Sequence, residues 1–313
     1  ISLIILLIVF IIFIFSAKQF QLDASSDTLI LEQDKDLIKY REIIKDYGSS
    51  DFLIVTFTDK NRILKTDNLK LIKLFINKIK TLDWVENVQS VFDVPLLDVN
   101  KQTLSDLANE VLTIESSGIS LIEAEREMVQ SPIFKNLIIS EDGTSTGLII
   151  YFKDDAEHQF LIDERDRLKE IKKPNEQEFN YYKKIIKDYD LSKREFDFSR
   201  HVNINEIRDI IKQFSNQNLK INLGGVSMIA DDTITFVKND IIIFGIGAIF
   251  FILIVLYVVF RNFLWMFICI SNCFASLIVM IGTVSLLGWK VTVISSNFIM
   301  LMLILSLSMT VHM

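Results

Sequence analysis

The side chains whose types and spacing suit chemistry lie close to the end of the sequence. Ser306, Ser308, Thr310 and His312 alternate with apolar residues in a stretch that is otherwise hydrophobic. Of these four, only the histidine titrates near neutral pH, and a histidine inside a membrane segment is costly enough to suggest a function. The hydroxyls would either line a polar pathway or, as small residues, let helices pack closely. A position of His312 at the membrane interface is the simpler alternative.

A second group of residues stands where the last charged part of the chain meets a long apolar stretch. It consists of Gly224 and Gly225, a predicted bend, followed by Asp231 and Asp232. Two neighbouring carboxylates can act as a general acid and base. No nucleophile, histidine or metal-ligand set accompanies them in the sequence, so we interpret them first as a solvated helix start. The alternative is a mechanical joint that transmits helix motion to the preceding domain.

Other residues of chemical interest have structural interpretations. Cys269 and Cys273 are one helical turn apart in an apolar segment, where they pack as small residues. Gly245-Ile246-Gly247 lies inside an apolar helix with no preceding strand, so it is a packing site and not a dinucleotide loop. His158 and His201 stand alone in charged helices and are expected to be exposed. Because no metal spacing, phosphate loop or catalytic triad is found, the sequence predicts no enzyme activity and no cofactor.

Charge is strongly segregated along the chain. Of 313 residues, 50% are hydrophobic and 23% are charged. Residues 1–17 carry no formal charge, and after Asp240 only Arg261 and Lys290 do. All 40 acidic residues therefore lie within 18–240, which predicts an acidic, water-exposed domain between membrane segments. Nucleic acid is excluded as a partner, because binding a phosphate backbone requires a basic face.

The apolar stretches predict transmembrane helices at 1–17, 241–260, 263–287 and 291–313, the last beginning as late as residues 295–297. A spanning helix needs about 20 apolar residues. The first stretch is shorter, so a secretory signal peptide is its alternative, although Ser16-Ala17-Lys18 is a poor cleavage site. The sequence begins at Ile1 and stops inside an apolar stretch, which predicts a fragment of a longer protein.

The domain at 18–240 is predicted to be an α+β domain. A strand, an amphipathic helix and a second strand follow one another at 51–58, 66–82 and 84–92, an order typical of a ferredoxin-like sandwich. A hairpin around Asp142-Gly143 joins 137–140 to 146–152. Further helices are predicted at 31–47, 119–130, 153–218 with a break at 173–175, and 228–239, and a final strand at 219–223.

Three stretches give the chain a family resemblance. They are the acidic, turn-rich segment 22–29, the Gly-Gly joint with its polar helix at 224–232, and the fourth apolar stretch, which ends in small and polar residues. With one helix, a large α/β domain and then closely spaced helices, the chain resembles the first half of a resistance-nodulation-division (RND) transporter of the MMPL-like or "predicted exporter" branch. The helices from the second span onward also resemble a sterol-sensing-domain bundle.

The resemblance implies a multi-pass protein of the bacterial inner (plasma) membrane, with the large domain as a porter domain on the extracytoplasmic side. It implies export of hydrophobic or lipid-like substrates driven by the proton gradient. The implied partners are the lipid bilayer, the C-terminal half of the same protein, and further copies of the chain or periplasmic proteins.

The sequence departs from the family pattern in the fourth span. Many relatives carry Gly-x-Gly-x-Asp there, with the Asp in the proton relay, and Ser306, Ser308 and Thr310 occupy these positions here. Threonine does not titrate near neutral pH, so His312 replaces the carboxylate, or the titrating group lies in the other half, or this branch is not proton-coupled. A sterol-sensing-like lipid-binding or sensing protein without active transport is the second hypothesis. A membrane-anchored hydrolase or receptor is the third, but it has no site in the sequence to support it.

Overall fold

The computed structural model describes residues 2–18, 20, 22–23, 39, 51–97, 112–169, 171, 175–215, 219–289, 291–292, 295 and 298–312. The chain divides into two compact units, one formed by Gly48–Asp231 and the other by Ile1–Tyr47 together with Asp232–Met313. The helix predicted at 31–47, apart from Lys39, and residues 24–29 of the acidic segment lie outside the described residues.

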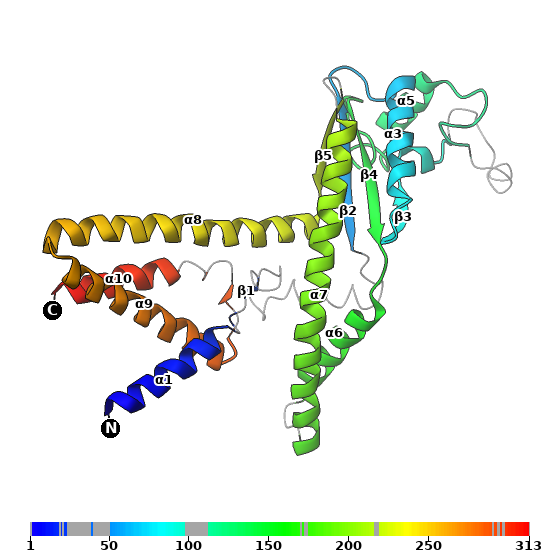
Figure 1. The fold of residues 1–313 in the computed structure, drawn as a ribbon. Helices are drawn as coiled ribbons and strands as arrows, with labels where there is room; N and C mark the ends of the chain where they lie inside the picture. Colours follow the sequence, from blue (N-terminus) through cyan, green and yellow to red (C-terminus); the bar gives the residue numbers. More distant parts are fainter. Residues whose placement is uncertain are drawn as a thin grey trace. The chain divides into compact units, whose positions relative to one another are not determined.

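The first unit contains an antiparallel sheet with the strand order β3-β4-β2-β5 (Figure 1). Its strands are β2 (Phe52–Asp59), β3 (Val85–Gln89), β4 (Ser145–Phe152) and β5 (Leu219–Gly224). Helix α3 (Thr66–Ile79) joins β2 to β3, and α6 (Ala156–Lys169) and α7 (Glu176–Phe214) join β4 to β5. This order and connectivity are those of a ferredoxin-like α+β sandwich.

One face of this sheet forms the core of the first unit. Every second residue of β2 is buried, so Leu53, Val55 and Phe57 point to one side while their neighbours are only partly covered. Phe75 of α3 is fully buried, with ring centroids 5.3 Å from Phe57 and 5.4 Å from Phe214 of α7. Removing such a ring typically costs about 3–5 kcal/mol, so these aromatic contacts fix the two helices on the sheet.

Two local predictions in this unit are only partly correct. Residues 137–140 form no full strand, but the hairpin is present in short form: Ile139 bridges Thr146, Ser140 N–H donates to the Ser145 oxygen, and Gly147 N–H donates to the Ile138 oxygen. The tight turn itself is present, with Gly143 at a φ of +67°. The strand expected at 84–92 ends at Gln89, where a Ser90–Asp93 capping box begins the short helix η2 (Val91–Asp93) before Pro95 is reached.

Helix α7 has two parts with different partners. Its later turns carry an apolar stripe, in which Ile204, Ile207 and Ile210 are buried in the core under the sheet. Its earlier turns pack against α6, where Leu161, Leu168 and Ile185 form a separate small cluster. The predicted break between α6 and α7 is present, and Asn175 starts α7 with a capping box to Glu178. Helix α5 (Leu121–Gln130) also packs on the core of this unit.

The second unit consists mainly of apolar helices. They are α1 (Ser2–Ala17), most of α8 (Val226–Phe260), α9 (Phe263–Leu286) and α10 (Phe298–His312). Helices α8 and α9 are long and apolar enough to cross a membrane, whereas the apolar part of α10 is shorter. The short helix predicted at 228–239 and the span predicted at 241–260 are one continuous helix, α8. This difference arises because no Gly or Pro between them interrupts the helix.

Helix α1 packs along α9 at very short range. A Cβ placed on Gly282 of α9 would lie 2.7 Å from the backbone oxygen of Phe13, so only glycine permits this approach. Just after α1, the short strand β1 (Leu22–Asp23) pairs in parallel with β6 (Val291–Thr292), and Phe20 contacts Phe298 at 6.4 Å between centroids. By contrast, no described atom lies near the Cβ positions of Gly245 and Gly247, so the expected packing at these glycines is not found within the described residues.

Candidate functional site

The strand β5 passes into α8 through the two glycines that the sequence marks as a joint. Gly225 has a φ of +123°, a conformation that residues with a side chain rarely adopt. A Cβ there would also lie 2.9 Å from the backbone oxygen of Phe52. At Gly224 the nearest atom to a Cβ, the Ile54 oxygen, is 3.9 Å away. Gly225 is therefore the residue that lets α8 begin directly against the start of β2.

A chain of polar contacts holds the first turn of α8. The Ser227 hydroxyl donates a hydrogen bond to the Asp51 carboxylate, and the other oxygen of Asp51 lies 3.1 Å from Arg200 Nε. The Arg200 guanidinium is 3.5 Å from the centroid of the Phe152 ring. Burial lowers the pKa of Arg200, and Asp51 opposes this effect as a neighbouring negative charge. These contacts join α7 and the start of β2 to the start of α8.

One turn further along α8, Asp231 joins a second polar cluster on α7. It is only 9% exposed, and its Oδ1 lies 2.7 Å from His201 Nδ1. Asp231 Oδ2 lies 3.9 Å from Arg208 Nη1. The Asn205 amide stands between the two basic residues, 3.0 Å from His201 Nε2 and 3.3 Å from Arg208 Nη1. If Asn205 donates to Nε2 and accepts from Arg208, the histidine is neutral and its Nδ1–H donates to Asp231.

This cluster corrects two interpretations of the sequence. Asp231 is not a solvated carboxylate without a histidine nearby, because α7 supplies His201 from 30 residues earlier. His201 is not an isolated exposed residue, because both of its ring nitrogens have partners. Asp232 remains half-buried beside them. The signal available in the sequence was the spacing of His201, Asn205 and Arg208, which places all three on one face of a helix.

The polar residues of α10 separate into two groups. Ser306 is buried, and its backbone oxygen accepts a hydrogen bond from the Thr310 hydroxyl at 2.7 Å. The Thr310 hydroxyl also accepts from the Asn272 amide of α9 at 2.8 Å, a contact that sequence reasoning missed. Ser308 lies on the exposed side of the helix. His312 is the last residue of α10, and its side chain is outside the described residues.

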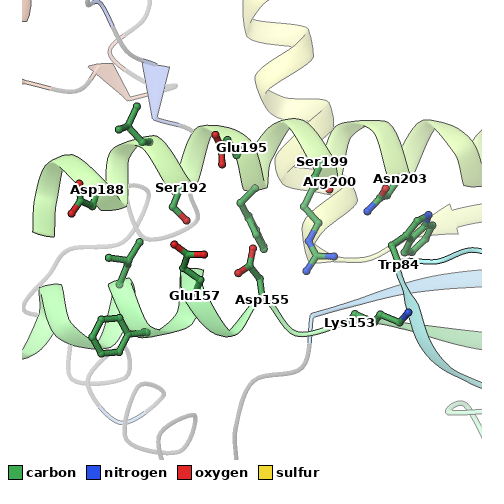
Figure 2. A pocket seen from close by; sticks show the side chains of 14 residues that line it. Trp84, Lys153, Asp155, Glu157, Asp188, Ser192, Glu195, Ser199, Arg200 and Asn203 are labelled. Atoms are coloured by element: carbon green, nitrogen blue, oxygen red, sulfur yellow. The ribbon is translucent and has the colours of Figure 1, made fainter.

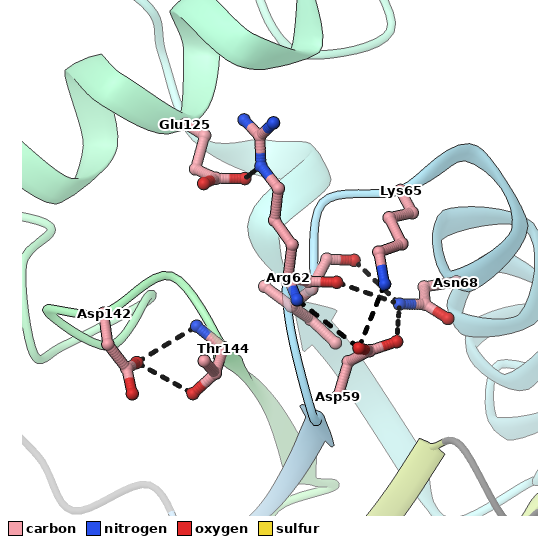
Figure 3. A network of polar contacts seen from close by, with 8 residues as sticks. Asp59, Arg62, Lys65, Asn68, Glu125, Asp142 and Thr144 are labelled. Atoms are coloured by element: carbon pink, nitrogen blue, oxygen red, sulfur yellow. Dashed lines mark hydrogen bonds and ion pairs between the residues drawn. The ribbon is translucent and has the colours of Figure 1, made fainter.

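A polar network at the end of β2 surrounds the Asp59 carboxylate, whose pKa is strongly lowered (Figure 3). Asp59 is 6% exposed and accepts from the Asn68 amide at 2.9 Å, the Asn61 backbone N–H at 2.8 Å and Lys65 Nζ at 3.1 Å. These donors, led by Asn68, hold the pKa of Asp59 far below its ordinary value. Beside it, Arg62 pairs with Glu125 at 2.5 Å. The network closes the β2–α3 connection and is structural.

His158 on α6 is also buried, contrary to the expected exposure. Its ring stacks on Phe196 with centroids 4.5 Å apart and on Tyr189 at 5.7 Å, and its Nδ1 lies 2.8 Å from the Ser192 hydroxyl. Burial lowers the pKa of His158. The ring therefore acts as an aromatic contact between α6 and α7. Among the described residues, no group of three or more His, Cys, Asp or Glu side chains is placed to hold a metal ion.

Comparison with known proteins identifies one family. The part of the chain from the middle of α7 to the end of α10, residues 196–311, matches the model of the MMPL family. This match contains the joint, its His201–Asp231 cluster and the three apolar helices α8–α10. No curated protein matches the chain. Members of the MMPL family are membrane transporters of hydrophobic substrates, and the apolar helices α8 and α9 agree with a membrane protein. Residues 196–311 are thus similar to the MMPL family of RND-type transporters over somewhat more than a third of the chain.

Proposed function

We propose that the protein is an RND-type exporter of hydrophobic or lipid-like molecules that uses the proton gradient. The observation that carries this proposal is the MMPL match, which covers the apolar helices together with the joint that connects them to the α+β domain. In this proposal the spans are residues 1–17, 241–260, 263–287 and 291–313, and residues 18–240 form a porter domain on the extracytoplasmic side of a bacterial plasma membrane. The C-terminal half of the protein would complete the transport path.

The joint at Gly224, Gly225, Asp231 and Asp232 is proposed to transmit motion. Helix α8 is continuous from Val226 to Phe260, with no Gly or Pro between Val226 and Asp240. Its first turns are attached to α7 by the Ser227–Asp51–Arg200 contacts and by the Asp231–His201 pair. A rotation or shift of α8 would therefore displace α7, and with it the part of the porter domain that α7 packs against.

Proton coupling within this chain is proposed to depend on His312. Thr310 does not titrate, and its hydroxyl is already hydrogen-bonded to Asn272 and to the Ser306 backbone. After Asp240 the sequence has no carboxylic acid side chain, so His312 is its one group that titrates near neutral pH. One proton moving down the electrical part of the gradient supplies about 2.3 kcal/mol per 100 mV.

The test is transport by the complete protein, with its C-terminal half, reconstituted in liposomes. A fluorescent phospholipid analogue would be followed from these vesicles to acceptor vesicles, with and without an imposed pH gradient. We expect gradient-dependent transfer that His312→Ala abolishes and Ser308→Ala leaves unchanged, since Ser308 is on the exposed side of α10. Equal transfer with and without the gradient in the unmodified chain would refute proton-driven export.

A second function has one observation in its favour. The Asn272–Thr310 hydrogen bond joins α9 to α10 through two neutral side chains, at the place where proton-coupled relatives are expected to carry a carboxylate. A neutral bundle of this kind suits a sterol-sensing-like protein that binds lipid without transporting it. Saturable binding of a fluorescent sterol, without any transfer in the liposome assay, would favour this second function over export.

A further inference from the structure

A groove of about 630 Å³ runs between α6 and α7 in the first unit (Figure 2). Side chains of both helices line it, and at one end it reaches Trp84 and Lys153 at the edge of the sheet. Its volume is in the range of small-molecule sites, about 300–1,000 Å³. The joint, Asp59 and α10 contribute no side chain to its lining. The groove therefore has no role in the functions discussed so far.

The lining of the groove is apolar and aromatic along much of its length. Phe160 of α6 and Leu191 of α7 both line the groove and are 57% and 52% exposed. Leu161, Phe196 and Trp84 lie deeper. Exposed apolar surface of this kind, with polar groups around it, is typical of a binding site and not of a solvated helix face.

A buried amide also faces the groove. Asn203 is 8% exposed and lines the end next to Trp84 and Arg200. Its amide atoms are not among the buried side-chain atoms that lack a hydrogen-bond partner, so the amide is open to a group that enters the groove. Its carbonyl oxygen is an acceptor for a donor group that enters the groove.

The charges of the lining favour a cation. Asp155 and Glu157 come from the start of α6, and Asp188 and Glu195 from α7. No ion pair of these four carboxylates is found with any described residue, whereas Arg200 is already paired with Asp51 and covered by Phe152. The lining thus carries four carboxylates against two cations, Lys153 and Arg200, and Asp155 also acts electrostatically on Arg200. Carboxylates beside exposed aromatic rings are the combination that binds ammonium groups.

We propose that the α6–α7 groove binds a cationic amphiphile, with its ammonium group among Asp155, Glu157 and Glu195 and its apolar body along Phe160, Leu191 and Phe196. The inference rests on the proposed function only in treating this ligand as cargo. Binding itself requires no gradient and no transport, so it is measured independently.

The test measures probe binding to the full chain in lipid nanodiscs. Of the three tryptophans, Trp84 lines the groove, so Trp265→Phe and Trp289→Phe leave its fluorescence as the reporter. The probes are hexyltrimethylammonium, hexyl sulfate and hexanol, which share an alkyl chain and differ in charge. We expect a saturable change of Trp84 fluorescence with the cation, about tenfold weaker binding of hexanol, and no saturable change with the anion.

Matched variants locate the binding in the groove. Glu157→Gln with Glu195→Gln is expected to weaken cation binding about tenfold. Glu123→Gln with Asp209→Asn removes the same charge from exposed positions outside the groove, and is expected to leave binding unchanged. Ser199→Phe fills the groove without changing its charge and is expected to abolish binding.

Two results would overturn the proposal. One is equal affinity for the three probes, and the other is a Glu157/Glu195 variant that binds as tightly as its control. If the chain fails to bind the cation while phospholipid transfer remains intact, only the proposed binding site in the groove is refuted. Loss of phospholipid transfer in a chain that still binds the cation contradicts the proposed export and leaves the groove assignment in place.

Discussion

His201 and Asp231 meet with Nδ1 of the imidazole 2.7 Å from Oδ1 of the carboxylate, although 30 residues separate them. The contact joins the middle of α7 to the second turn of α8. Because Asp231 is nearly buried, its carboxylate needs this donor, and Arg208 at 3.9 Å adds a favourable charge. The pair is therefore one of the polar attachments of α8 to the α+β domain, beside the Ser227–Asp51 hydrogen bond.

Asp231→Ala should lower the free energy of unfolding of the α+β domain by about 1–3 kcal/mol, because His201 loses its acceptor. Thermal unfolding of the full chain in nanodiscs, followed by circular dichroism, measures this effect. Asp240→Ala removes an exposed carboxylate of the same helix and serves as the control. A double-mutant cycle with His201→Ala should give a coupling energy of about 0.5–3 kcal/mol. A coupling energy of zero would show that the pair does not hold the helices together.

Gly225→Ala should destabilise the joint by about 1–3 kcal/mol or more, because its φ of +123° is strained for alanine and its Cβ would meet the Phe52 oxygen at 2.9 Å. Gly224→Ala is the matched control, since the nearest atom to its Cβ is 3.9 Å away. Chemical denaturation of both variants tests the difference. Equal stability of the two would contradict the close approach of α8 to β2.

Asp59 should make the α+β domain sensitive to acid. Its pKa in the folded state is depressed below the ordinary value of 3.8 by its hydrogen bonds, led by the one from Asn68. The stability that it contributes is therefore present above about pH 4 and is lost as the pH falls toward the folded-state pKa. In Asp59→Asn the drop in unfolding free energy below pH 4 should be smaller than in the unmodified chain. Asp209→Asn, at an exposed carboxylate, controls for net charge, and an acid response identical to that of Asp59→Asn would argue against this assignment.

His158 should make the stability of the α+β domain depend on pH in a second range, closer to neutral pH. Its folded-state pKa is lowered from 6.5 by burial, so the unfolded chain binds a proton before the folded one does. Stability is then complete above about pH 6.5 and falls as the pH drops from 6.5 toward the folded-state pKa. His158→Phe keeps a ring between Phe196 and Tyr189 but has no group to protonate. Its unfolding temperature should change less between pH 7 and pH 5 than that of the unmodified chain, and an unchanged profile would count against a buried neutral histidine.

Thr310→Val should loosen the contact between α9 and α10, because the hydroxyl that accepts from Asn272 is replaced by a methyl group of similar size. Hydrogen bonds between membrane helices contribute about 0.6–2 kcal/mol. Unfolding of the full chain in mixed micelles with increasing SDS measures the loss. Ser308→Ala, on the exposed side of α10, should leave the midpoint unchanged. A shift of the same size in both variants would mean that the Asn272 contact contributes nothing specific.

Local periodicity predicted much of the fold. The helix predicted as amphipathic at 66–82 buries one apolar face in α3, formed by Leu69, Ile72, Phe75, Ile76 and Ile79. Helical spacing decides which residues share a face, whatever the helix packs against. The break before Asn175 was likewise visible, because capping is a property of neighbouring residues.

Features that depend on distant residues were not predicted. The burial of His158 and the pairing of His201 with Asp231 depend on how α7 packs against α6 and α8. The contact of Asn272 with Thr310 was missed because an amide in an apolar helix has no spacing signal that names its partner.

The close approach of Phe13 to Gly282 has a consequence for how the protein is made. Ribosomes add about 5–20 residues per second, so α1 leaves the ribosome roughly 13–54 s before the part of α9 that it packs against. During that interval the whole α+β domain is synthesised, while the α9 face of α1 has no partner from its own chain. The first helix therefore exists without this partner for that interval, and its docking at Gly282 is a late step of assembly.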